Sequence, residues 1–265
     1  MTSSFDRRPI FVTGAASGIG KSIVMRLLAA GFVVGLSDRN LDLCRALRDQ
    51  IDPEGLATDV HGVDVRDRGA IVDALDHLET RFGPLYGAVA AAGVSLPARA
   101  EDMDELEWST VIDINLTGAF NTAQLAGQRL LRHYRGSIVI IGSIGGQAGR
   151  AAYCASKAGV AGLTKVLAIE WGSRNVRVNT IAPSVIDTPL VTEGLSADFV
   201  RDVVEDRIPM GRIGWPGEVA DVCAFLLGDQ SSYVNGVVLP VCGGLMAGFL
   251  THQHGKKAAD IQAHE

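Results

Sequence analysis

The stretch Thr13-Gly14-Ala15-Ala16-Ser17-Gly18-Ile19-Gly20 lies between a short apolar run at 9–13 and a helical pattern that starts at 18. Its glycines meet three demands of a strand–turn–helix unit: a sharp turn, close approach of backbone to a pyrophosphate, and tight packing of the helix on the sheet. The first N–H groups of the helix and its positive dipole end favour phosphate. Glycine spacing alone also fits an ordinary turn, but the strand, turn, helix and next strand together favour a phosphate-binding turn.

An acidic residue ends the second predicted strand. Asp38 follows the apolar run 32–37, 18 residues after Gly20, a separation at which a carboxylate can accept hydrogen bonds from an adenosine ribose. The same charge repels the 2′-phosphate of NADP, so the pattern favours NAD. Two observations leave alternatives open: Asp38 can cap the next helix, and the adjacent Arg39 can bind a phosphate.

Apolar runs and helical patterns alternate through the rest of the chain. The alternation predicts a single α/β domain with a doubly wound, Rossmann-type parallel sheet of about seven strands and right-handed crossovers. The segment 184–215 interrupts this order, carries a helical piece near 196–207, and is expected to lie over the ligand crevice. The strands are predicted at 9–13, 32–37, 56–63, 85–91, 136–142, 175–181 and 235–241, and the helices at 18–30, 40–50, 67–81, 103–133, 151–172 and 216–228.

Composition and charge exclude several classes of protein. The chain has 24 basic and 30 acidic residues among 265, and 47% of its residues are hydrophobic. Global disorder is therefore excluded, and binding to nucleic acid or an anionic membrane has no electrostatic support. The uncharged stretch 230–251 is too rich in glycine and polar residues for a membrane span. The four cysteines show no C-x-x-C spacing, so we expect reduced thiols, no metal site and a cytoplasmic location.

A tyrosine and a lysine stand four residues apart at the start of a predicted helix. This spacing puts the phenol of Tyr153 and the ammonium of Lys157 on one helix face. A free tyrosine has a pKa near ~10, and a nearby ammonium lowers it by favouring the phenolate. Tyr153 is thus a candidate general acid or base. The Y-x-x-x-K pattern alone is commonplace and mostly structural, and it gains meaning from the phosphate-binding turn earlier in the chain.

Further motifs follow in a fixed order along the chain. They are T-G-x-x-x-G-x-G at Thr13–Gly20, Asp64-Val65, Ala-Ala-Gly at 91–93, Asn115, Ser143, Tyr153 with Lys157, Asn179, and Pro183 with Ile186 and Thr188. With this ordered set, the sequence resembles the short-chain dehydrogenase/reductase family over residues 9–250.

The resemblance implies a catalytic set and its roles. Ser143 would hydrogen-bond the substrate oxygen, and Tyr153 would exchange a proton with it. Lys157 would bind the nicotinamide ribose and lower the tyrosine pKa, and Asn115 would position a water that leads the proton to solvent.

The resemblance also implies the cofactor site. Asp64 and Val65 would hold the adenine, Gly93 would border the cofactor ribose, and Ile186 and Thr188 would meet the carboxamide of nicotinamide. The expected cofactor-binding residues are Gly14, Ser17, Gly18, Ile19, Gly20, Asp38, Asp64, Val65, Gly93, Tyr153, Lys157, Ile186 and Thr188.

The expected function is NAD-dependent hydride transfer between nicotinamide and a secondary alcohol or ketone. Two alternatives remain: an NADPH-dependent 3-oxoacyl-carrier reductase, and a non-catalytic nucleotide-sensing protein of the same fold. We expect residues 1–250 to form the catalytic domain and 251–265 a polar tail. The helices at 103–133 and 151–172 are rich in small residues, and in the resembling family they form the interface of a homotetramer.

The pocket departs from the family pattern. Ser143 stands only ten residues before Tyr153, so the loop between them is shortened. Its glycines let it bend, and we expect Ser143 to reach the Tyr153 hydroxyl. The substrate itself is not defined by the sequence. The expected lining residues are Ser95, Leu96, Gly145, Gly146, Gln147, Val185, Leu190 and Trp215.

Overall fold

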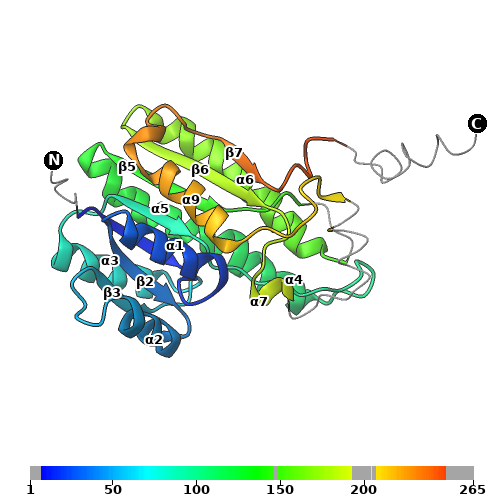
Figure 1. Ribbon diagram of the computed structural model, residues 1–265, viewed down its shortest axis with the longest axis horizontal. Coiled ribbons are helices and arrows are strands. Elements are labelled where there is room, and N and C mark those ends of the chain that lie inside the picture. The colour runs from blue at the N-terminus through cyan, green and yellow to red at the C-terminus, as the bar shows by residue number, and fades with distance from the viewer. Residues whose placement is uncertain (1–6, 146–148, 193–203, 205–206, 249–265) are drawn as a thin grey trace, which may run out of the picture.

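A computed structural model describes residues 7–145, 149–192, 204 and 207–248. Seven parallel strands form one sheet in the order β3-β2-β1-β4-β5-β6-β7, which confirms the predicted doubly wound sheet (Figure 1). The strands are β1 (Pro9–Thr13), β2 (Val33–Asp38), β3 (Thr58–Gly62), β4 (Gly87–Ala90), β5 (Gly136–Ile141), β6 (Val176–Pro183) and β7 (Val238–Val241). The predicted tail at 251–265 and most of the helical piece near 196–207 lie outside the described residues.

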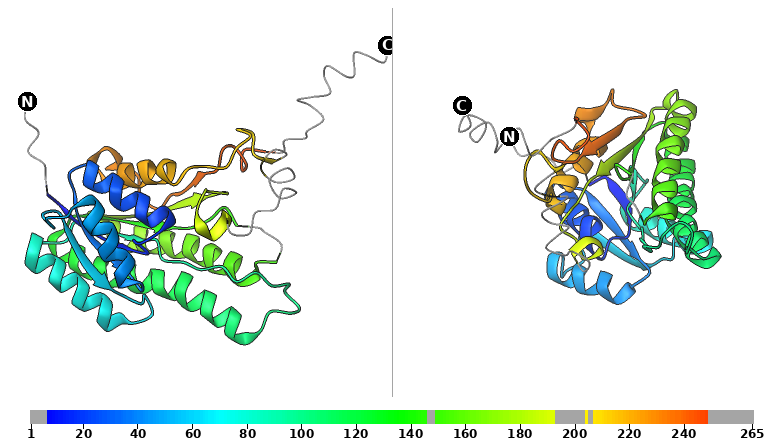
Figure 2. Two further views of the ribbon diagram at one scale, coloured as in Figure 1. Left: turned by 60° about the horizontal axis from the view of Figure 1, so that its bottom comes forward. Right: turned by 90° about the vertical axis from the view of Figure 1, so that its right-hand side faces the viewer.

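Helices cover both faces of the sheet, as Figure 2 shows. α1, α2 and α9 pack with one core cluster, and α3, α5 and α6 pack with the other. Among the residues described, no helix is both long and apolar enough to cross a membrane. The helices are α1 (Gly18–Ala29), α2 (Leu41–Ile51), α3 (Arg68–Phe82), α4 (Glu105–Ile112), the π-helical η1 (Asp113–Thr117), α5 (Gly118–His133), α6 (Ala151–Gly172), α7 (Pro189–Thr192), α9 (Pro216–Leu227) and the 3-10 turn η3 (Asp229–Ser231).

The central strand shows why a nearly continuous apolar run becomes a buried strand. Ile10 and Val12 of β1 point into the cluster under α1 and α9, and Phe11 points into the cluster under α3 and α5. All three side chains are fully buried. A parallel strand covered on both faces needs apolar residues at every position. β1 also lies between β2 and β4, where the strand order reverses, and such a switch point is where doubly wound sheets bind ligands.

The strand expected at 235–241 begins only at Val238, and two other predicted elements differ from the structure in ways that have a local cause. The helix expected at 103–133 is interrupted by the π-helical turn η1, which joins α4 to α5. The strand expected at 56–63 begins only at Thr58, because the carboxylate of Asp52 accepts hydrogen bonds from the N–H groups of Leu56 and Ala57 and forms a turn there. Hydrophobic periodicity does not reveal either feature.

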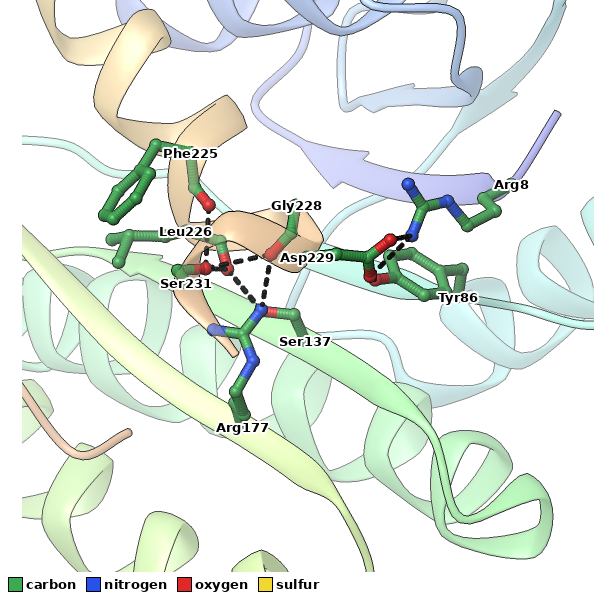
Figure 3. Close-up of polar contacts among 9 residues, drawn as sticks. All are labelled: Arg8, Tyr86, Ser137, Arg177, Phe225, Leu226, Gly228, Asp229 and Ser231. Atoms are coloured by element: carbon green, nitrogen blue, oxygen red, sulfur yellow. Dashed lines mark hydrogen bonds and ion pairs between the residues drawn. The ribbon is translucent and has the colours of Figure 1, made fainter. Parts of the chain in front are cut away.

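A polar cluster at the amino edge of the sheet closes the last turn of α9 (Figure 3). Arg177 Nη2 donates to the carbonyls of Leu226 and Gly228, and Ser137 Oγ donates to Leu226 as well, at 2.8 Å. Ser231 Oγ bonds the same turn. These bonds satisfy carbonyls that a helix end otherwise leaves unpaired. The cluster therefore fixes the end of α9 at the amino edge of the sheet. The carboxyl edge, where β1 leads into the phosphate-binding turn, is the opposite one.

Candidate active site

A cleft of about 340 Å³ opens at the carboxyl edge of the sheet, a volume typical of small-molecule sites of roughly 300–1,000 Å³. Its walls come from the segments after β1 to β6 and from α7. Every residue expected to bind the cofactor lines it: Gly14, Ser17, Gly18, Ile19, Gly20, Asp38, Asp64, Val65, Gly93, Tyr153, Lys157, Ile186 and Thr188. Asn115 and Ser143 are not among the lining residues.

The phosphate-binding turn needs its glycines for separate reasons. Gly14 has a φ of 66°, and a Cβ there would lie 2.7 Å from the backbone of Ala92. A Cβ on Gly20 would lie 1.9 Å from the carbonyl oxygen of Gly14. Neither position admits a side chain without movement of backbone. The first glycine sets the turn beneath the segment after β4, and the last lets α1 begin directly against the turn.

The start of α1 leaves N–H groups for an anion. Its N-cap Ser17 makes no side-chain capping bond, and the first turn carries no acidic residue. N–H groups of a first turn have no partner within their helix, and the dipole there favours negative charge. This end of α1 therefore has the donors and the polarity that a pyrophosphate requires.

Asp38 orients toward the same turn. Its Oδ2 accepts from the N–H of Ala16 at 3.3 Å, and its Oδ1 accepts from the N–H of Asn40 at 3.0 Å. The N-cap of α2 is Asn40, whose side chain accepts from Leu43, so Asp38 is not the helix cap that the alternative reading proposed. Arg39 is exposed and lines the cleft beside Asp38.

Asp64 and Val65 lie on the far wall. Asp64 forms an ion pair with Arg66 at 2.6 Å, and the hydrogen bonds from Arg66, opposed by partial burial, lower the pKa of this carboxyl. Val65 is buried, and its carbonyl accepts from Asn121 Nδ2 at 3.0 Å. A Cβ on Gly118 would lie 2.4 Å from the Val65 side chain, so α5 begins directly against this wall.

Tyr153 and Ser143 meet although the loop between them is short. A side-chain hydrogen bond from Ser143 acts on the Tyr153 phenol, as the sequence analysis expected. Burial raises the pKa of Tyr153, and the Ser143 bond and the positive charge of Arg150 oppose that effect. Tyr153 thus holds its proton in this structure.

Lys157 is 6% exposed and lies on the same face of α6 as Tyr153. Burial lowers the pKa of its ammonium to about 8. Nζ donates to the carbonyl of Ile141 at 2.7 Å and lies 5.6 Å from the centre of the Tyr153 ring. The lowered tyrosine pKa that the resemblance implied is not seen here, because the ammonium points to the end of β5 and burial dominates the phenol.

Asn115 sits in the π-helical turn η1 and is 1% exposed. Its side-chain amide makes two hydrogen bonds with the backbone of Val94. Oδ1 accepts from the Val94 N–H at 2.8 Å, and Nδ2 donates to the Val94 carbonyl at 2.9 Å. Nδ2 also lies 3.2 Å from Ser156 Oγ. A Cβ on Gly93 would lie 3.4 Å from Asn115 Oδ1 and 3.6 Å from Lys157 Nζ. Asn115 thus fixes the segment after β4 beside Lys157.

Ile186 and Thr188 form the lip of the cleft, which is the rim that faces the phosphate-binding turn. Both are buried, and Thr188 Oγ1 donates to the carbonyl of Ile186 at 3.3 Å. A bridge between Ile186 and Gly214 ties this segment to the chain before α9. Across the mouth, a Cβ on Gly18 would lie 3.4 Å from the Thr188 side chain. The lip therefore faces the phosphate-binding turn directly.

One polar pair close to Tyr153 was missed by sequence reasoning. Arg150 Nη1 donates to Ser95 Oγ at 2.7 Å. Ser95 was expected in the lining, but neither Ser95 nor Arg150 is among the residues that line the cleft. The position of Arg150 one helical turn before Tyr153 was the available signal for the pair. Of the other expected lining residues, Leu190 lines the cleft, whereas Leu96, Gly145, Val185 and Trp215 are not among its lining residues. Gly146 and Gln147 lie outside the described residues.

These features fit a nicotinamide dinucleotide. The unpartnered N–H groups at the start of α1 suit the pyrophosphate, the carboxylate of Asp38 suits a ribose hydroxyl, and Lys157 and Tyr153 stand at the other end of the same cleft. The cleft thus offers donors for phosphate and acceptors for ribose in the order that the cofactor needs.

Comparison with known proteins agrees with a site for a nicotinamide cofactor. The family model described as enoyl-(acyl carrier protein) reductase matches residues 14–246. The chain is 39% identical over 245 residues to the 3-oxoacyl-(acyl-carrier-protein) reductase of Thermotoga maritima, covering 89% of this chain and 96% of that one. It is 41% identical over 259 residues to the cis-4-hydroxycyclohexanecarboxylate dehydrogenase of Sinomonas cyclohexanicum, covering 93% and 100%.

A solved structure shows the same fold. The gluconate 5-dehydrogenase of Burkholderia cenocepacia, in complex with NADP and tartrate, matches with a TM-score of 0.86 and 30% identity over 92% of this chain and 99% of that one. With the family model and the sequence relatives, this match shows that the chain belongs to the short-chain dehydrogenase/reductase family and is an oxidoreductase with a nicotinamide cofactor.

Proposed function

We propose that the protein is an NAD-preferring dehydrogenase that interconverts a secondary alcohol and its ketone. The observation that carries this proposal is the hydrogen-bonded Ser143–Tyr153 pair, beside buried Lys157, at one end of the cleft whose other end is the phosphate-binding turn. When bound, the nicotinamide ring accepts or supplies the hydride.

The chain's own residues would handle the proton and the substrate oxygen. In the reducing direction, Tyr153 gives its proton to the carbonyl oxygen, and Ser143 donates a hydrogen bond to the same oxygen. Burial raises the pKa of Tyr153, so the phenol carries the proton that this step transfers. In the oxidising direction Tyr153 accepts the proton, and Lys157 and Asn115, which meet at Gly93, start the path to solvent.

Preference for NAD rests on Asp38. Its two hydrogen bonds to backbone N–H groups hold the carboxylate at the turn, where it can accept from a ribose hydroxyl and repels a 2′-phosphate. Arg39 beside it, and the NADP in the gluconate 5-dehydrogenase structure, support the alternative preference. Steady-state kcat/KM with NAD and NADP decides between them, and an equal or higher value with NADP contradicts the proposal.

A second candidate function is NADPH-dependent reduction of a 3-oxoacyl thioester. The 39% identity to a 3-oxoacyl-(acyl-carrier-protein) reductase favours it. Absorbance at 340 nm, with panels of secondary alcohols and ketones and with acetoacetyl thioesters, separates the two activities. Turnover of thioesters alone, with NADPH, would support the second candidate instead.

Tyr153→Phe tests the catalytic assignment. We expect turnover to fall by about 10³-fold or more while cofactor binding persists, because the phenol is the proposed proton donor. Tyr134→Phe is the control: that tyrosine is 62% exposed and should keep full activity. Retained turnover in Tyr153→Phe removes this residue from the mechanism, and no turnover by any variant or by the wild type supports the non-catalytic alternative.

We also propose a homotetramer in the cytoplasm, with residues 1–250 as one catalytic domain. Exposed apolar side chains on the α4 and α6 helices support the assembly: Leu106, Trp108, Val166 and Ile169. A second copy would remove them from water. Four free cysteines support a reducing compartment. Light scattering that gives a monomer mass at micromolar concentration contradicts the assembly.

A further inference from the structure

Arg150 is held in place by the segment that follows β4. It precedes α6 by one residue and stands one helical turn before Tyr153. The N–H of Ala98 donates to the carbonyl of Gly149 at 3.0 Å, and Ala98 and Arg150 form a parallel bridge. The backbone under Arg150 is therefore tied to the other side of the pocket, and its position does not depend on a free loop.

The guanidinium is oriented by a neutral partner. Arg150 Nη1 donates to Ser95 Oγ at 2.7 Å, and Ser95 lies two residues after Gly93, the glycine that faces Lys157 and Asn115. Both Arg150 and Ser95 are half-buried. Neither residue lines the cleft, but both adjoin its wall, because Ser95 follows the lining residues Gly93 and Val94, and Arg150 stands three residues before the lining residue Tyr153.

The charge of Arg150 has no acidic partner within the described residues. Elsewhere in the described residues, Arg129 pairs with Asp76 and Glu79, and Arg8 pairs with Asp229. Buried Arg177 has no carboxylate partner either, but its donors are taken up by the carbonyls of Val234, Leu226 and Gly228. A guanidinium has five N–H donors, and toward the residues that the structure describes Arg150 uses one of them, on a hydroxyl. Its field reaches the phenol of Tyr153, since the positive charge acts to lower that pKa. A cation without an acidic partner among the described residues thus acts on the phenol that is the proposed proton donor.

We propose that Arg150, oriented by Ser95, binds a carboxylate of the substrate, which makes the substrate a hydroxy or oxo carboxylic acid. This inference rests on the proposed function and names its substrate class. A planar guanidinium with free donors matches a carboxylate in two parallel hydrogen bonds. The Ser95 hydroxyl, which accepts from Arg150, keeps its own proton to donate to the same group. The carboxylate then fixes the carbinol carbon relative to Ser143 and Tyr153.

The test compares acids with their neutral counterparts. Wild type and Arg150→Met are assayed with NAD on a panel of hydroxy acids and on the primary amide of each acid. We expect kcat/KM for the acids to fall by about 10- to 100-fold in Arg150→Met, mainly through KM, and the amides to change by less than about 3-fold. Arg150→Lys should recover part of the loss. Arg99→Met is the control, because Arg99 lies in the segment after β4 that carries Ser95 and its side chain is 80% exposed. This variant should have the same kcat/KM as the wild type.

Other outcomes overturn the inference. Equal loss for acids and amides, with an alkaline shift of the pH–rate profile, would mean that Arg150 acts only on the Tyr153 pKa. Equal loss with a lowered melting temperature would make it a structural residue. Wild-type turnover of the amides as efficient as that of the acids also contradicts a carboxylate subsite.

A binding arm separates this inference from the proposed function. Cyclohexanecarboxylate and cyclohexanecarboxamide are added to the enzyme with NADH, and the melting temperature is measured. If no panel compound turns over, the proposed function fails. The melting temperatures still test whether Arg150 binds a carboxylate, because they do not depend on turnover. Stabilisation of the wild type by the carboxylate alone, absent in Arg150→Met, supports it. Equal responses of the two proteins, or no response, refute it.

Discussion

Lys157→Met should make the protein more stable and inactive. Lys157 is buried, and its ammonium has no carboxylate partner among the described residues; burial is the cause of its lowered pKa. Lowering a lysine pKa from 10.5 to about 8 corresponds to about 3 kcal/mol of lost stability while the lysine is charged. Methionine removes this penalty with a side chain of similar shape. It also removes the hydrogen bond to the Ile141 carbonyl, which costs about 1 kcal/mol.

The net gain at pH 7 is about 2 kcal/mol, or roughly 4–8 °C in melting temperature for a chain of this size. The gain must depend on pH. Below pH 8 the lysine is charged in both the folded and the unfolded state, so the wild type bears the full free-energy cost of the buried charge. Between pH 8 and 10.5 the folded state releases the proton first, and the wild type gains stability as pH rises. By pH 9.5 the advantage of Lys157→Met should shrink by about 2 kcal/mol.

Thermal and urea unfolding without cofactor, at pH 7.0 and 9.5, measures both effects, and turnover is assayed in parallel. Lys165→Met is the control, because Lys165 is an exposed lysine of the same helix and should change stability by less than about 0.5 kcal/mol. A Lys157→Met protein that is less stable than the wild type at pH 7 would refute the buried-charge reasoning. So would a stability difference that is the same at both pH values.

Three further substitutions probe other parts of the site. Asp38→Asn should raise kcat/KM with NADP relative to NAD by about 10-fold or more, since the repulsive charge is removed; an unchanged ratio in steady-state kinetics shows that Asp38 does not select the cofactor. Gly14→Ala puts a Cβ 2.7 Å from the Ala92 backbone at a positive φ, so urea unfolding should show a loss of about 2–4 kcal/mol; wild-type stability contradicts the close approach. Asn115→Ala leaves the N–H and carbonyl of Val94 unpaired, and should cost about 1–3 kcal/mol together with a lower kcat; an unchanged kcat restricts Asn115 to a structural role.

The sequence predicted which residues would meet because the topology brings them together. In a parallel sheet, all strands end at one edge, so residues far apart in the chain, such as Gly14, Asp38 and Ile186, come together as soon as each is placed after its strand. The glycine pattern predicted the turn for a similar reason: a Cβ at Gly14 or Gly20 would collide with backbone. Both inferences depend on local geometry and strand order alone.

The features that were missed depend on contacts between distant segments. The π-helical turn around Asn115 follows from its bonds to Val94, 21 residues earlier, and an apolar pattern does not distinguish it from an α-helix. The Arg150–Ser95 pair spans 55 residues. The raised pKa of Tyr153 depends on how deeply the folded pocket buries the phenol, which a Y-x-x-x-K spacing does not report.

The charges of the cleft indicate what the enzyme is built to bind. Among the half-buried or buried arginines of the described residues, Arg8, Arg48 and Arg129 pair with carboxylates, and Arg177 donates to three carbonyls. Within the same residues, Arg150 donates only to one hydroxyl, and Lys157 donates only to one carbonyl. Keeping a cation in such a place lowers the stability of the free protein, and sites that carry function often do so. A ligand that supplies the missing hydrogen-bond acceptors returns this free energy as affinity. Because the two cations flank Tyr153, cofactor ribose at Lys157 and substrate carboxylate at Arg150 would be held on either side of the reacting oxygen.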